Sequence, residues 1–149
     1  MSDETKPWLK AKMLIEVAGF PQEHVDSTIK LIAEKFAADR KDVRNVSKKI
    51  NAANKVDSKD VTEFYSGFLE IDAEYADVIP LLHLTLEFMP AHVEILEPQS
   101  LQMDSTDLTE LFTDLSGRIH QYESIVRGLK AEQEIIEREY NKLIPEEKK

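Results

Sequence analysis

The sequence contains no cysteine and only four glycines in 149 residues. Without cysteine there is no disulfide, no thiol nucleophile and no cysteine metal site, and this composition suits a cytoplasmic protein. So few glycines argue against a glycine-rich phosphate-binding loop. The motifs GxxxxGK[ST], GxGxxG and GxSxG are all absent from the sequence. No apolar run approaches the roughly 18 residues that a membrane span needs. The N-terminal MSDETKPWLK is too polar for a secretory signal.

Lysine and arginine are absent between Val61 and Glu110, a stretch that holds eleven Asp and Glu residues. The formal net charge is −10, which opposes binding to nucleic acid and to anionic membranes. The charge balance is reversed between Lys35 and Asp60, where eight basic residues accompany four acidic ones. This basic segment is either a solvated, lysine-rich hairpin that protects an edge strand, or a segment that binds an acidic surface.

Hydrophobic periodicity predicts the elements of an N-terminal domain. Apolar and polar residues alternate at 8–18, 64–75 and 92–96, which is typical of strands, whereas a three-to-four-residue repeat at 21–38 and 78–89 predicts helices. The proline at position 21 suits the first position of its helix, and the aspartate at position 77 suits an N-cap.

Residues 41–60 fit two interpretations. Val46, Ile50 and Ala52 can share one face of a strand, whereas Asn51 and Asn54 are typical of turns.

The order of these elements predicts an α+β class with a ferredoxin-like βαββαβ domain over residues 1–97. Right-handed crossovers would place the first and third strands side by side and parallel, with both helices on one face. The other parts are then a linker at 98–105, a coiled-coil helix at 106–144 and a charged tail at 145–149. RNA-recognition modules share this topology, but an acidic sheet would repel the phosphate backbone.

The sheet face turned away from both helices is predicted to be acidic, with apolar residues between the charges. We call these residues the acidic sheet face: Leu14, Glu16, Phe68, Glu70, Asp72, Glu94 and Leu96. Three of its carboxylates, Glu16, Asp72 and Glu94, are expected near the same end of the sheet, where they could hold Mg²⁺ or Ca²⁺ or act in acid–base chemistry. The alternatives are a solvated polar face and, as we expect, a surface that binds a basic protein segment.

From about Thr106 the pattern changes to a coiled-coil heptad repeat. Apolar residues follow strict four-three spacing over five heptads, interrupted once by Gln133. A helix over this range would be roughly 57 Å long at about 1.5 Å per residue. Leu111 and Ile125 widen the apolar stripe. The predicted interface residues, called the seam below, are Leu108, Phe112, Leu115, Ile119, Tyr122, Val126, Leu129, Gln133, Ile136, Tyr140 and Leu143.

The sequence therefore predicts a non-enzymatic protein-interaction or assembly factor. The four histidines lack metal-site spacing, and we expect no cofactor, no metal and no catalytic residue. The expected partners are a second copy or another helical protein at the seam, and a basic protein segment at the acidic sheet face. The alternative is a small-molecule-sensing regulatory domain, as in ACT-type modules, paired by the coiled coil. A carboxylate-based metal site or enzyme is the third possibility.

Overall fold

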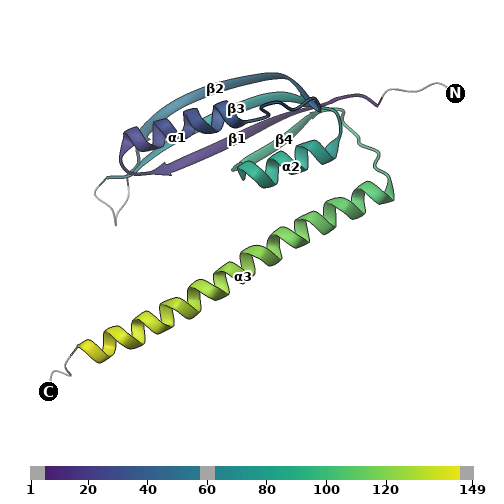
Figure 1. The fold of residues 1–149 in the computed structure, drawn as a ribbon. Helices are drawn as coiled ribbons and strands as arrows, with labels where there is room; N and C mark the ends of the chain where they lie inside the picture. Colours follow the sequence, from purple (N-terminus) through teal and green to yellow (C-terminus); the bar gives the residue numbers. More distant parts are fainter. Residues whose placement is uncertain (1–5, 58–62, 145–149) are drawn as a thin grey trace. The chain divides into compact units, whose positions relative to one another are not determined.

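A computed structural model describes residues 6–57 and 63–144 (Figure 1), so the predicted charged tail at 145–149 lies outside the described residues. Met1–Asp104 forms one compact unit and Ser105–Lys149 a second. The predicted α+β class is confirmed, and the order of the elements approximates the predicted βαββαβ arrangement followed by a long helix. The elements are β1 (Leu9–Gly19), α1 (Gln22–Lys35), β2 (Val43–Lys55), β3 (Tyr65–Tyr75), α2 (Val78–Phe88), β4 (His92–Glu97) and α3 (Ser105–Leu143).

The four strands form one antiparallel sheet in the order β2-β3-β1-β4. The first and third strands are neighbours as predicted, but the prediction that they are parallel is wrong. Leu9 lies opposite Tyr75 and Gly19 opposite Tyr65, so β1 and β3 run in opposite directions. The reason is that β3, the strand after β2, pairs antiparallel with it, whereas β2, which follows α1, has the same direction as β1.

The core lies between one face of the sheet and the helices α1 and α2, which both cover that face (Figure 1). Alternate residues of β1 and β3 are buried there, which is the period-two pattern of a half-buried strand. The helices contribute Val25, Ile29, Leu81 and Leu84. The buried hydrophobic residues of the two central strands are Leu9, Ala11, Met13, Ile15, Leu69, Ile71, Ala73 and Tyr75.

The two short helices begin close to the predicted positions. The Asp77 side chain accepts a hydrogen bond from the Val78 N–H at 2.7 Å, so the predicted N-cap of α2 is confirmed. Pro21 was predicted at the first helical position of α1, but it is the N-cap, one position earlier, and its backbone is extended. Among the described residues, no helix is both long and apolar enough to cross a membrane.

Residues 43–55 form a continuous edge strand rather than a turn. The asparagines Asn51 and Asn54 belong to β2, and the pairing with β3 shifts register between them. Ala53 is buried at this shift, whereas Val46, Ile50 and Ala52, which could share one face of a strand, are exposed. Side chains of α1 bind the irregular backbone here: Gln22 Nε2 donates to the Ala53 carbonyl and Asp26 Oδ1 accepts from the Ala53 N–H, both at 2.8 Å. These tertiary bonds replace the ladder bonds that the bulge removes, and local propensity does not predict them.

The basic residues of β2 and its approach have specific contacts. The Arg40 guanidinium donates to both carboxylate oxygens of Asp42 at 2.8 and 2.6 Å, which lowers the pKa of Asp42. Lys48 Nζ donates to the carbonyls of Ala33 and, at 3.1 Å, Phe36, where α1 ends. Lys48 therefore binds the end of α1 that carries the negative pole of the helix dipole.

Replacing Lys48 with methionine should lower the free energy of unfolding by about 1 kcal/mol. The change keeps an unbranched side chain of similar length but removes the ammonium that binds the last carbonyls of α1. Urea unfolding followed by circular dichroism measures the loss. Lys49→Met is the matched control, because Lys49 is exposed and makes only a 3.6 Å ion pair with Glu70, so its loss should stay within about 0.5 kcal/mol. Equal losses in the two variants would contradict a capping role for Lys48.

Candidate interaction surfaces

The seven residues of the acidic sheet face lie on the side of the sheet opposite the core. In β1 and β3 they occupy the positions between the buried residues, and the register places Leu14 opposite Glu70 and Glu16 opposite Phe68. In β4, Glu94 lies opposite Lys12, and Leu96 lies at the point where the pairing with β1 shifts register. Leu14, Phe68 and Glu70 are half-buried, whereas the other four residues are exposed.

The same face also carries basic residues, which come from β1 and β2. Lys12 Nζ lies 3.7 Å from Asp72 Oδ1, Lys49 Nζ 3.6 Å from Glu70 Oε2, and Arg44 Nε 2.6 Å from Glu74 Oε2. Lys10 forms a further ion pair with Glu97 at 3.3 Å. The long stretch without lysine or arginine is therefore placed beside basic residues from strands that are distant in sequence. Each pair is solvent-exposed in part, so its contribution to stability is small.

The carboxylates Glu16, Asp72 and Glu94 do not converge, so the expectation that they lie near one end of the sheet is wrong. Asp72 and Glu94 flank Lys12 on its two sides. Glu16 is four residues further along β1, about 13 Å at 3.3 Å per residue, and it accepts a hydrogen bond from the Ser66 hydroxyl at 2.6 Å. The antiparallel pairing of β1 and β3 separates them. This geometry does not form a three-carboxylate cation site.

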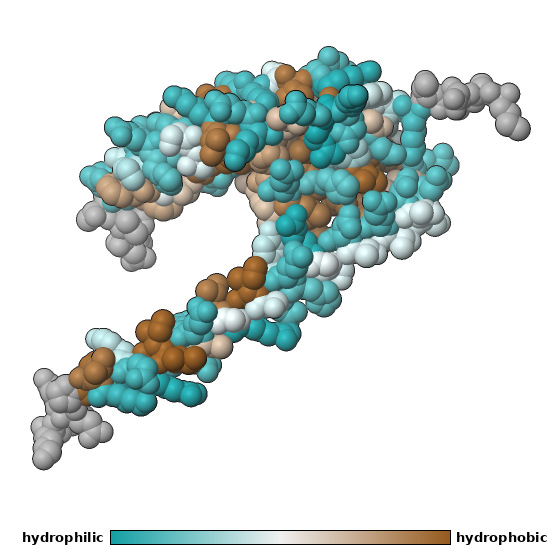
Figure 2. Space-filling view, viewed as in Figure 1, coloured by the Kyte–Doolittle hydropathy of each residue, from teal (hydrophilic) through white to brown (hydrophobic). Residues whose placement is uncertain are grey.

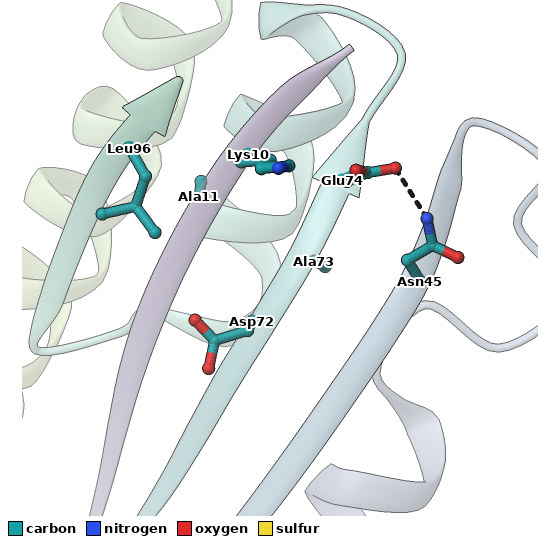
Figure 3. Close-up of a pocket in the computed structure, with 7 residues that line it drawn as sticks. All are labelled: Lys10, Ala11, Asn45, Asp72, Ala73, Glu74 and Leu96. Carbon is teal, nitrogen blue, oxygen red and sulfur yellow. Dashed lines mark hydrogen bonds between the residues drawn. The ribbon is translucent and has the colours of Figure 1, made fainter. Parts of the chain in front are cut away.

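A shallow hollow of about 230 Å³ lies on this face, between the first residues of β1 and β2 and the last residues of β3 and β4 (Figure 3). Glu74 accepts hydrogen bonds there from Arg44 Nε at 2.6 Å and Asn45 Nδ2 at 2.8 Å, and these bonds lower its pKa. The Arg44 guanidinium also stacks over the Trp8 ring at 4.0 Å. The residues that line the hollow are Lys10, Ala11, Asn45, Asp72, Ala73, Glu74 and Leu96.

The cluster of Trp8, Arg44, Asn45 and Glu74 was not found from the sequence. The sequence pattern gives little indication of this cluster, because a bulge brings the side chains of Arg44 and Asn45 together at Glu74. At this bulge the register shifts after Arg44, and Asn45 has a left-handed backbone with φ of 51°. Arg44 and Lys49 are five residues apart, a spacing that places them on opposite faces of a regular strand, so their common face depends on the same bulge.

The second candidate surface is α3, a continuous helix of 39 residues that contains all eleven seam residues. At 1.5 Å per residue it is about 58 Å long. None of its residues is buried, and apolar side chains recur along it in Figure 2. Ile119 is 57% exposed, Leu129 59% and Ile136 67%. A helix with such a stripe leaves large apolar side chains in water unless another surface covers them.

The seam residues divide into the two apolar positions of a heptad, written a and d. Two polar contacts within the helix lie beside the seam, where Glu123 accepts from Arg127 and Glu139 accepts from Lys142 at 2.8 Å. In a third, Gln133 of the seam donates to Glu137 beside it at 3.0 Å. Positions a are Phe112, Ile119, Val126, Gln133 and Tyr140, and positions d are Leu108, Leu115, Tyr122, Leu129, Ile136 and Leu143.

Comparison with known proteins gives one family match. The model of the MJ0538 family matches residues 10–146, which include nearly all of the sheet domain and all of α3. No curated protein matches the chain, and no solved structure matches it. The match therefore extends over the residues of the long helix as well as those of the sheet.

Proposed function

We propose that this protein, which belongs to the MJ0538 family, is a non-enzymatic assembly factor that associates with a second copy of itself through α3. The exposed heptad seam of α3 carries this proposal. Ten of its eleven positions are apolar, and the spacing is the one that keeps a single face turned toward a partner helix.

The magnitude of the expected burial supports association. Covering one Leu or Ile side chain contributes roughly 1.5–3 kcal/mol. Association of two chains costs an estimated 4–15 kcal/mol. Because every seam residue except Gln133 is apolar on both copies, partial burial of the seam is enough to exceed that cost.

The acidic sheet face supplies a second contact surface in this proposal, with a basic protein segment as its partner. Leu14, Phe68 and Leu96 would act as apolar anchors, and the carboxylates would orient the segment. Among residues 6–57 and 63–144, no ion pair reaches Glu16 or Glu94. The other two carboxylates of this face, Asp72 and Glu70, already pair with Lys12 and Lys49, which reduces the surface available to a basic partner.

The competing functions have less support. A small-molecule sensor would use the hollow beside Glu74, but its volume of about 230 Å³ is below the roughly 300–1,000 Å³ of ordinary ligand pockets. Its acidic groups are also engaged by Arg44, Asn45 and Lys12. A carboxylate metal site or enzyme has lost the geometry on which it depended, because Glu16 lies far along the sheet from Asp72.

Light scattering tests the self-association. The full-length chain at tens of micromolar should have about 34 kDa, twice the 17.1 kDa of one chain, because paired helices of this length should have dissociation constants below the micromolar range. A chain ending at Asp104, which keeps the compact unit with the sheet, should remain folded and have the mass of a monomer. A full-length chain of 17 kDa at this concentration would refute the proposal.

A further inference from the structure

We infer that the two copies of α3 pair antiparallel, with Val126 facing Leu129, Ile119 facing Ile136, and Phe112 facing Leu143 of the second copy. The inference rests on the proposed self-association and adds the direction and register of the helices. The observation that carries it is the placement of charged residues beside the seam, which distinguishes this arrangement from the alternatives.

The seam limits the possible registers. In an antiparallel pair each a residue faces a d residue, so the helices can slide only by whole heptads. The register above overlaps the two helices from Phe112 to Leu143, which covers all of the seam except Leu108. The flanking positions e and g must then decide the direction.

In this register the flanking charges are complementary. Arg118 at g faces Glu139 at g of the second copy, and Glu123 at e faces Lys130 at e. The two-fold axis repeats each contact, so both attractive pairs occur twice. The remaining flanking residues within the overlap, such as Ile125 opposite Glu132, bring no like charges together.

A parallel in-register pair is less favourable. Arg118 would face Glu123 of the second copy, but Glu132 would face Glu137, so repulsion offsets attraction. Ile125, which widens the apolar stripe, would lie next to Lys130.

The two antiparallel registers shifted by one heptad each have a conflict. In one of them Glu132 would meet Glu132 of the second copy, and Phe112 and Leu115 would lie outside the overlap. In the other, called the shifted register below, Leu108 faces Tyr140. Arg118 would face Glu132, but Glu123 would meet Glu123 of the second copy near the two-fold axis.

Gln133 also favours the inferred register over the shifted one. In the inferred register it faces Tyr122 of the second copy, whose hydroxyl is a hydrogen-bond partner for the amide. In the shifted register it faces Leu115, which offers the amide no hydrogen-bond partner. In the single chain Gln133 Nε2 already donates to Glu137 Oε1 at 3.0 Å, so its side chain lies along the flank of the seam.

Charge exchange in the full-length protein tests the register. Arg118→Glu should weaken dimerisation about tenfold, because two symmetry-related attractions become repulsions. Adding Glu139→Arg should restore the dissociation constant to within about twofold. The matched controls add Glu123→Arg or Glu132→Arg to the same background and should not restore it. Sedimentation equilibrium measures each constant.

The other outcomes overturn the inference. Rescue by Glu123→Arg would show a parallel pair, and rescue by Glu132→Arg the shifted register. An unchanged dissociation constant in Arg118→Glu would show that this flank does not contact the second copy. These results differ from failure of the proposed function, in which the unsubstituted protein is already a monomer.

Disulfide cross-linking gives an independent measurement because the chain has no cysteine of its own. Leu115→Cys should form little cross-linked dimer by itself, but it should cross-link to Tyr140→Cys when the two variants are mixed, since these positions face each other across the antiparallel seam. Efficient cross-linking of Leu115→Cys with itself would show parallel helices and refute the inference. Non-reducing gels and mass spectrometry identify the products.

Discussion

Ile119→Asp should convert the assembled protein to monomers while the sheet domain remains folded. Ile119 occupies an a position of the seam and is 57% exposed in the single chain. Pairing would place the new carboxylate in an apolar interface, and burying an unpaired charge costs several kcal/mol, so we expect the dissociation constant to rise more than 100-fold. Light scattering measures the mass, and near-UV circular dichroism checks the sheet domain.

Ile135→Asp is the matched control for this prediction. Ile135 lies on the same helix, has the same side chain and is 59% exposed, but its heptad position is c, outside the seam. The substitution should change the dissociation constant by less than about threefold. Equal dissociation in the two variants would show that α3 associates through a different face, or that any aspartate simply weakens the helix.

Local hydrophobic periodicity was sufficient to predict the elements that bury one face at regular intervals. β1, β3 and both short helices appear where alternation or three-to-four spacing predicts them, because each buries a single face. The direction of β3 was not predictable in this way, since residues such as Ile71 alternate identically in a parallel and an antiparallel strand. Direction depends on the connection between β2 and β3, and β2 was the element that the sequence left ambiguous.

The contacts of the charged sheet face could not be predicted from local periodicity either. Glu70 and Asp72 were predicted to belong to a charged face, yet the residues that contact them, Lys49 and Lys12, are distant in sequence. Contacts of this kind become visible only once strand order and register are known. The seam of α3 needs no such information, because a helix alone fixes which residues share its face. The helix alone does not determine which surface covers the seam, so pairing with a second copy is our proposal.

Gly67→Ala should lower the free energy of unfolding by about 2 kcal/mol. A Cβ atom at this position of β3 would lie 2.5 Å from Ile29 Cδ1 of α1 and 3.2 Å from the Ala53 backbone of β2. Elsewhere, replacing glycine with alanine commonly stabilises a protein by about 0.4–1 kcal/mol through the unfolded chain. Here overpacking, which typically costs about 1–3 kcal/mol, exceeds that gain. Urea unfolding of the full-length protein measures the difference.

Ile29→Val provides the test of the cause, because it deletes Cδ1, the atom nearest to the added methyl group. Alone it should cost about 1 kcal/mol, as an ordinary loss of one buried methylene. Combined with Gly67→Ala it should cost about 2 kcal/mol, less than the sum of the single losses, because the deleted atom makes room for the new one. The 3.2 Å contact with the Ala53 backbone remains, so relief is incomplete. Strict additivity of the two losses would show that α1 does not exclude a side chain at Gly67, and that the glycine is required by the approach of β2 alone.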